Sequence, residues 1–229
     1  MFITRLLVFA GLLLLTFLSS CGGSDPQSPE PTEVSFQLFP NGYFSAGFRE
    51  EYNITGTSPS GLMLQGTHLQ LTQTATSFNG QQANPVRIQN DWTDTNTSQM
   101  FSNGSTEYYS TATDNKTLLG SQDLFTMVIG IPVSAAVIPQ TAKIGDSGTH
   151  ASYTDNLGNT TTLTWTLQDA GNNQARLVWA SETRDVNSVL LIEGNTSYVI
   201  SENGTRQSMT ILFDVKAFAD PVSWVGAKI

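Results

Sequence analysis

The chain has 229 residues, with 10 lysines and arginines against 19 aspartates and glutamates, which gives a formal net charge of −9. An acidic chain without clustered basic residues is poorly suited to bind nucleic acid, and it would be repelled from anionic lipid headgroups. Its one cysteine, Cys21, has no second thiol in the chain with which to form a disulfide.

The first twenty residues have the pattern of an export signal. An apolar or small stretch of thirteen residues, 6–18, follows a single positive charge at Arg5. As a helix this stretch would rise about 20 Å, which is short of the roughly 30 Å hydrocarbon core of a bilayer. We therefore expect residues 1–20 to be a secretory signal peptide and not a membrane span.

The signal ends on the motif Leu18-Ser19-Ser20-Cys21. This motif resembles the lipobox of bacterial lipoproteins. The resemblance implies that the Cys21 sulfur receives a diacylglyceryl group, that the signal is cut just before it, and that the new amino terminus is acylated. Gly22 follows where aspartate favours inner-membrane retention in enterobacterial lipoproteins, so the outer membrane is the expected location. The alternative is an ordinary signal peptide with an unrelated cysteine nearby.

Residues 21–33 are expected to be the lipidated cysteine and a flexible tether. The segment 22–33 contains three prolines and no apolar anchor, and largely extended it would reach about 35 Å. Cleavage after residue 20 would remove one basic residue and no acid, so the mature charge is 9 − 19 = −10. Several acyl chains, and not the acidic surface, would then hold the protein to the membrane.

From residue 34 to residue 229 the sequence predicts one β domain. The segments 162–167, 175–181 and 208–218 alternate apolar and polar residues with a period of two. In the first of them, Leu163 and Trp165 should share one face, opposite threonines on the other face. Such alternation, rich in Thr, Val, Ile and aromatic residues, predicts antiparallel strands with one wetted face. The expected fold class is mainly β, as a sandwich or an open curved sheet.

Turn residues divide these segments. Asn-Gly pairs supply the positive φ angles that hairpin turns need, and they occur at Asn41–Gly42, Asn79–Gly80, Asn103–Gly104 and Asn203–Gly204. Strands are predicted at 34–39 and 44–48 on the two sides of the first pair. The segment 121–139, interrupted by Pro132 and Pro139, is predicted to be a strand followed by a connecting segment.

A weak internal repeat also appears. Gly104, Thr106 and Tyr108 recur ninety residues later as Gly194, Thr196 and Tyr198. This recurrence suggests two similar halves, 34–120 and 143–229, that are joined by the segment between them. Chance similarity between threonine-rich hairpins is the alternative.

One motif points to hydrolysis. Gly145-Asp146-Ser147-Gly148 is similar to the stretch around the nucleophile of chymotrypsin-like serine proteases. The resemblance implies a role for Ser147 as nucleophile, and the family order of His, Asp and Ser is available in His68, Asp91 or Asp94, and Ser147. The continuation Thr149-His150 departs from the family's Gly-Pro, and a β-turn leading into a strand is the preferred interpretation.

Metal sites and paired carboxylates receive little support. His68 and His150 lie 82 positions apart, which leaves zinc without an evident set of ligands. The segments 91–96 and 155–159 offer clustered oxygens for calcium but do not match its twelve-residue loop, so turns are preferred. Neighbouring residues on a strand face opposite sides, so Glu50 and Glu51 should not act together as the two carboxylates of a glycosidase. For Glu182 and Asp185, the other candidate pair, the sequence does not fix the distance between the carboxylates. We expect no metal or cofactor.

Four tryptophans could contact a ligand. Trp165 and Trp179 lie in apolar alternation and are predicted to be core. Trp92, among polar neighbours, is the one to test for ligand contact, although packing in the core or in a hairpin is the preferred interpretation there too. The sequence thus predicts a lipid-anchored envelope protein with a non-catalytic binding or structural β domain. Its expected partner, besides the membrane, is an envelope protein or a glycan. The alternative is a lipid-anchored hydrolase of serine-protease type that uses Ser147.

Overall fold

The computed structural model describes residues 34–155, 157–217 and 220–229. These residues are organised in strands, turns and connecting segments, and they form no helix of the length and apolar character that a membrane crossing requires. The predicted signal peptide, Cys21 and the tether lie outside the described residues.

Seventeen strands are present in the described residues. In chain order they are β1 (Ser35–Gln37), β2 (Arg49–Thr57), β3 (Met63–Thr72), β4 (Thr76–Phe78), β5 (Gln81–Asp94), β6 (Met100–Ser110), β7 (Lys116–Asp123), β8 (Ile129–Gly130), β9 (Ser134–Ala135), β10 (Val137–Ile138), β11 (Thr141–Lys143), β12 (Ser147–Thr154), β13 (Thr160–Gly171), β14 (Gln174–Arg184), β15 (Leu190–Ile200), β16 (Arg206–Val215) and β17 (Val222–Lys228).

Fifteen of the strands form one large sheet. Its order is β10-β7-β6-β5-β3-β2-β17-β16-β15-β14-β13-β12-β9, with β4 added on β5 and β8 on β7; β1 and β11 form a separate two-stranded sheet. Each strand pair in both sheets is antiparallel. The prediction of a mainly β, antiparallel fold is confirmed. The architecture is one continuous curved sheet and not the two packed sheets of a sandwich.

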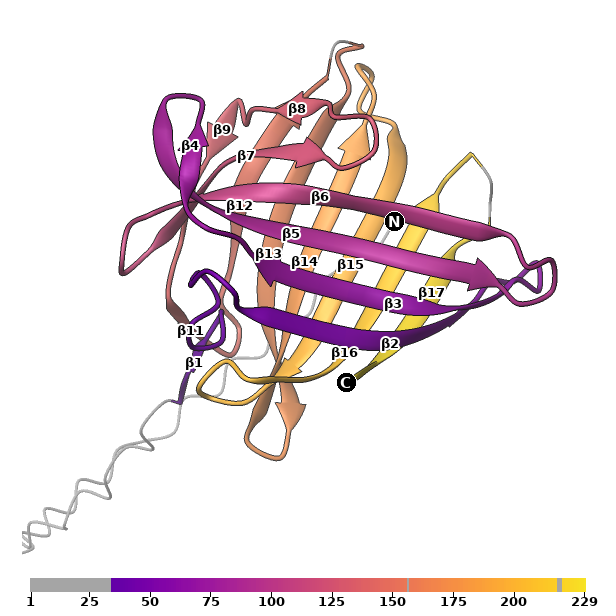
Figure 1. Cartoon of the computed structure of the whole chain (residues 1–229), viewed down its shortest axis with the longest axis horizontal. Helices are drawn as coiled ribbons and strands as arrows, with labels where there is room; N and C mark the ends of the chain where they lie inside the picture. The colour runs from indigo at the N-terminus through magenta and orange to yellow at the C-terminus, as the bar shows by residue number, and fades with distance from the viewer. Residues whose placement is uncertain (1–33, 156, 218–219) are drawn as a thin grey trace, which may run out of the picture. The chain divides into compact units, whose positions relative to one another are not determined.

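The large sheet curls over its own inner face. In Figure 1 the strands β2, β3, β5 and β6 cross in front of β13 to β16. Side chains meet across this space from strands that are not neighbours in the sheet. The rings of Trp92 on β5 and Trp224 on β17 have centroids 5.6 Å apart, and Gln70 on β3 donates a hydrogen bond to Tyr198 on β15.

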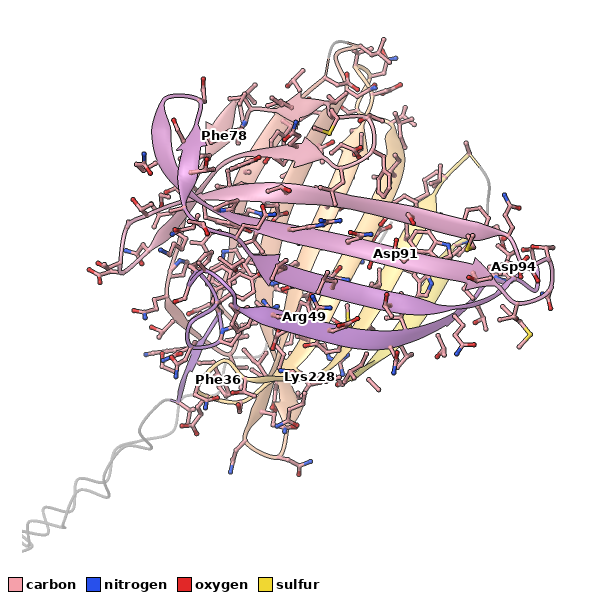
Figure 2. The ribbon with its side chains drawn as sticks, viewed as in Figure 1. Phe36, Arg49, Phe78, Asp91, Asp94 and Lys228 are labelled. Atoms are coloured by element: carbon pink, nitrogen blue, oxygen red, sulfur yellow. The ribbon has the colours of Figure 1, made fainter. Side chains whose placement is uncertain are left out.

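The inner face carries the alternation that the sequence predicts. On β13, Trp165 and Leu167 are buried, and their cross-strand partners on β14, Trp179 and Leu177, point to the same face. The buried core continues to the small sheet, where Phe36 of β1 is 1% exposed; Figure 2 labels it at the lower end of the domain. The positions predicted to be apolar and inward on β13 and β14 are therefore confirmed.

Two local predictions are wrong. Asn103–Gly104 is not a turn, since both residues lie within β6 and Gly104 pairs with Gln89. A Cβ at Gly104 would lie 2.4 Å from the Ile88 carbonyl oxygen, so this glycine permits close strand contact, while the actual turn follows Asp94 and has Ser98 at a φ of 60°.

The predicted strand at 44–48 is likewise a series of turns. Gly42 and Gly47 have φ angles of 76° and 88°, and the amide of Ser45 donates to the Gly42 carbonyl at 2.8 Å. This left-handed backbone is incompatible with an extended strand. The Asn-Gly pairs at 41–42, 79–80 and 203–204 do form turns, and their glycines each have a φ of 76°.

One short segment pairs with both ends of the large sheet. We call residues Ser134–Ile138 the seam segment: its first two residues form β9 on β12, and its last two form β10 on β7. The amide of Ala136, between them, donates to the carbonyl of His150 at 3.0 Å. Pro132 and Pro139 lie on its two sides and cannot donate to a ladder, and each pairing is two residues long. The prediction for 121–139, a strand followed by a connecting segment, is correct only in part: residues 121–123 end β7, but the rest contains the two-residue strands β8, β9 and β10.

Candidate functional site

A cavity of about 350 Å³ lies on the concave inner face of the sheet. Residues from β2, β3, β5 and β6 line it together with residues from β12 to β17, so it needs the curl of the whole sheet. Most of the lining side chains are aromatic or aliphatic, and Glu107 and Arg206 are the only acidic or basic ones among the described residues that line it. A pocket of this size, apolar with a few convergent polar groups, is the usual form of a small-molecule site.

Three of the four tryptophans line this cavity. Trp92 and Trp224 lie together, as described above, and Trp179 lies on β14 with its ring stacked on Phe39 at 5.6 Å between centroids. Trp92, the tryptophan chosen for a test of ligand contact, lines the cavity and also packs against the core. Trp179, predicted to be core, also faces the cavity, whereas Trp165 is 5% exposed and does not line it.

Glycines on the inner face make room for these rings. Gly56 pairs with Trp224 across β2 and β17, and a Cβ at Gly56 would lie 2.4 Å from the indole Cδ1. Gly66 pairs with Trp92 across β3 and β5, and a Cβ there would lie 1.9 Å from the carbonyl oxygen of Asp91. Both distances are far below van der Waals contact. The position of the Trp224 indole thus depends on glycine at position 56, whereas Gly66 permits the close approach of the β3 and β5 backbones beside Trp92.

A buried ionic cluster forms one wall of the cavity region. Arg206 donates to Glu50 at 3.2 Å and also to the side-chain oxygen of Gln70. Lys228 donates to the other Glu50 oxygen at 2.6 Å, and the Arg206 and Glu50 side chains are only 1% and 3% exposed. The guanidinium lies over the rings of Tyr43 and Tyr198, 4.9 and 4.1 Å from their centroids. Both buried charges are thus already paired by the protein itself.

His68 belongs to the same network. Its Nδ1 lies 2.7 Å from the Asn90 oxygen and its Nε2 lies 3.1 Å from the Gln70 nitrogen, so both ring nitrogens have protein partners. Burial lowers the pKa of His68 to about 4, against the opposing effect of the Asn90 hydrogen bond. The ring is therefore neutral at pH 7 and acts as a hydrogen-bonding link within the cluster.

His150 differs from His68 in this respect. It is 5% exposed and lines the cavity, yet no hydrogen bond joins its side chain to another described residue. Its ring lies edge-on to Trp179, with centroids 5.3 Å apart and an interplanar angle of 90°. Burial lowers its pKa to about 4, so this ring too is neutral at pH 7.

Glu107 on β6 is the acidic residue of the lining. It accepts a hydrogen bond of 2.6 Å from the hydroxyl of Tyr109, and burial raises its pKa, against the opposing effect of that hydrogen bond. No basic side chain among the described residues forms an ion pair with it.

The residues proposed for a serine-protease site are not joined in the structure. Ser147 is exposed, while its neighbour Gly148 faces the inner indole of Trp165, so the Ser147 side chain points to the outer face. His68 faces inward, and no hydrogen bond links it to Ser147. Asp94 lies at the hairpin end of β5 and Asp91 further back along that strand (Figure 2).

The two aspartates have local roles. Asp91 accepts hydrogen bonds from Ser102 at 2.6 Å and from Gln89 on the same strand. Asp94 accepts a hydrogen bond of 2.6 Å from the Thr97 hydroxyl, which holds its pKa below the usual range and fixes the turn after β5. Neither contacts His68, whose Nδ1 faces Asn90.

The residues considered for metal binding and for paired carboxylates also have local structural roles. Within the described residues, no group of three or more His, Cys, Asp or Glu side chains is placed to hold a metal ion. Asp155 accepts hydrogen bonds from Asn159, and Asp185 from the amides of Asn187 and Val189, so both stabilise turns. Glu182 pairs with Arg184 on the surface.

The two adjacent acids on β2 point in opposite directions, as the strand geometry predicts. Glu50 belongs to the buried cluster, and Glu51 pairs with Arg49 at 2.6 Å nearer the surface. The role of Glu50 was not predicted, because its partner Arg206 lies 156 positions further along the chain.

Comparison of the chain with models of protein families, with curated proteins and with solved structures finds no match. The cavity and its chemistry are therefore the basis for a functional proposal.

Proposed function

We propose that this protein is a lipid-anchored envelope protein whose β domain binds a small, mainly apolar ligand in the inner cavity. The observation that carries the proposal is the cavity of about 350 Å³ lined by Trp92, Trp179 and Trp224. A volume of this order lies within the range of sites for small molecules and suits a ligand of modest size.

The construction of the wall supports binding. Aromatic side chains offer large apolar contact with little loss of conformational freedom, so they bind ligand rings efficiently. The ionic cluster holds Tyr43 and Tyr198 in place, and Gly56 makes room for the indole of Trp224. A wall held in this way loses little entropy when a ligand enters, which favours affinity.

The same lining favours an apolar ligand over a glycan. Sugar rings stack on tryptophan, but their many hydroxyl groups need a matching set of free hydrogen-bonding groups. Here Asn90, His68 and Gln70 are already bonded to one another and to protein partners. A ligand with few polar groups fits the groups that remain.

The proposal can be tested with N-phenyl-1-naphthylamine, an uncharged apolar dye that fluoresces in apolar surroundings. We expect saturable fluorescence with the purified β domain, and loss of it in Thr196→Trp, which would fill the cavity from the inner face of β15. The matched control is Val225→Trp, which adds the same side chain on β17 at a position 62% exposed. Equal binding by the wild type and by Thr196→Trp would contradict the proposal.

The anchor is the second part of the proposal and is supported by the lipobox-like sequence at Cys21 and the tether behind it. Mature protein from the native host should carry acyl chains on Cys21 and fractionate with the outer membrane. Cys21→Ala should abolish the acylation and release the protein from the membrane. Mass spectrometry of the amino-terminal peptide gives the answer, and an unmodified thiol would contradict this part.

A further inference from the structure

His150 has the features of a residue kept available for a ligand. Its side chain lines the cavity, its exposed fraction is only 5%, and it forms no hydrogen bond within the described residues. A buried polar group without a partner is costly, so native proteins rarely leave one unpaired. His68, on the other side of the same cavity, has both ring nitrogens occupied.

The accessible part of the His150 ring is its Nε2 atom. Nδ1 is fully enclosed and has no hydrogen-bond partner. Nε2 is not fully enclosed, and it too has no hydrogen-bond partner among the described residues. Since the side chain lines the cavity, Nε2 is the atom that a ligand could reach. A neutral imidazole can donate or accept through this nitrogen, depending on the tautomer.

The ring chemistry of the ligand follows from the neighbours of His150. Trp179 lies edge-on to His150 and faces the same cavity, so a ligand group bonded to Nε2 would place its body against an indole. Trp92 and Trp224 lie further along the cavity wall. This arrangement favours a flat or ring-bearing ligand over a flexible chain.

The charge of the ligand follows from the lining. Arg206 is already paired with Glu50, so the described residues of the lining offer no unpaired cation to an anionic ligand. Glu107, the acidic residue of the lining, would favour a cation, but it already accepts a hydrogen bond from Tyr109. Burying an unpaired ligand charge would be costly, whereas an uncharged hydroxyl or carbonyl group can bond to His150 without that cost.

We propose that the cavity binds an uncharged, ring-bearing ligand through a hydroxyl or carbonyl group that hydrogen-bonds to His150 Nε2. This inference rests on the proposed function, because it names the ligand class for the same cavity.

The test compares four naphthalene compounds that share one ring system: 2-naphthol, naphthalene, 2-naphthoate and 2-naphthylmethylammonium. Binding to the β domain is measured by isothermal titration calorimetry. We expect 2-naphthol to bind more tightly than the other three. In His150→Phe, which keeps an aromatic ring beside Trp179, 2-naphthol should lose about tenfold in affinity while naphthalene is unaffected, in line with the loss of one hydrogen bond.

A conservative variant separates hydrogen bonding from packing. His150→Gln keeps a donor and an acceptor, and it should restore most of the 2-naphthol affinity that His150→Phe loses. Unchanged binding of naphthalene shows that each variant is folded.

The outcomes distinguish this inference from the proposed function. Equal binding of naphthalene and 2-naphthol by the wild type would overturn the role of His150 and leave cavity binding in place. Tighter binding of either charged compound would overturn the choice of an uncharged ligand. Failure of all four compounds while N-phenyl-1-naphthylamine binds would also overturn the inference, and failure of that dye as well would remove the proposed function together with it.

Discussion

The guanidinium of Arg206 and the carboxylate of Glu50 meet at 3.2 Å, and neither side chain is more than 3% exposed. The two residues come from β16 and β2, which are separated by β17 in the sheet. The pair therefore links the amino-terminal strands of the domain to the carboxyl-terminal strands. Its energetics can be predicted from the cost of leaving a buried charge without its partner.

We predict that Glu50→Gln lowers the free energy of unfolding by about 3–5 kcal/mol, because it leaves the buried Arg206 without a carboxylate. Arg206→Met should be less harmful in the Glu50→Gln background than in the wild type, since the two residues interact directly. Guanidinium denaturation of the two single variants and the double variant measures the coupling. Strictly additive effects would show that the pair contributes nothing as a pair.

Stability should also depend on the two buried histidines. Their pKa values are about 4 in the folded protein, against 6.5 for an unperturbed histidine. Between these values the unfolded chain binds more protons than the folded one, so stability falls as the pH is lowered from about 6.5 to 4 and is fully present above 6.5. Each of the two groups contributes about 3 kcal/mol.

This dependence can be measured by urea denaturation at pH 7.5 and pH 4.5. His150→Phe should lose roughly half of the decrease that the wild type shows, because it retains only His68. An equal decrease in both proteins would mean that His150 is not buried in its neutral form.

Gly66 and Gly194 provide a matched pair of glycines on the inner face. Gly66→Ala should destabilise the domain by several kcal/mol, because the new Cβ would meet the backbone oxygen of Asp91 at 1.9 Å and separate β3 from β5. Gly194→Ala should cost much less, because the Cβ would meet only the Ser181 hydroxyl, which can rotate. Thermal unfolding followed by circular dichroism ranks the two variants, and the reverse order would contradict the register of β3 on β5.

Ser147 should behave as an ordinary surface residue. It points to the outer face and has no hydrogen bond to either histidine, so a fluorophosphonate probe should not label it. Ser147→Ala should change the free energy of unfolding by less than about 0.5 kcal/mol. Labelling of the wild type that disappears in Ser147→Ala would revive the hydrolase interpretation.

Local patterns in the sequence predicted the strands well where one face of the strand is buried. The alternation in β13 and β14 identified the inward residues, because antiparallel pairing needs only nearby residues to agree. Glycine was the main source of error. At Gly104 the residue serves close contact between strands, and the sequence alone does not distinguish this from a turn.

The cavity depended on information that local patterns do not contain. Trp92 was identified by its polar neighbours, but its contact with Trp224 follows from the curl of the sheet. The recurrence of Gly104, Thr106 and Tyr108 at 194–198 shows the same limit. The later set lines the cavity, whereas the earlier set does not: on β6 the lining residues are Asn103, Glu107 and Tyr109. Two similar halves stay a prediction.

The seam segment joins the two ends of the large sheet by two residue pairs on each side, whereas β13 and β14 share eleven. A junction with so few ladder bonds opens at a lower free energy than any long strand pair, so its amides should exchange with deuterium before those of β13. At the same time it covers both sheet edges, which otherwise would offer their free amides to another copy of the chain. The domain thus combines protection against aggregation with a locally weak junction directly beside His150, whose carbonyl accepts a hydrogen bond from the amide of Ala136.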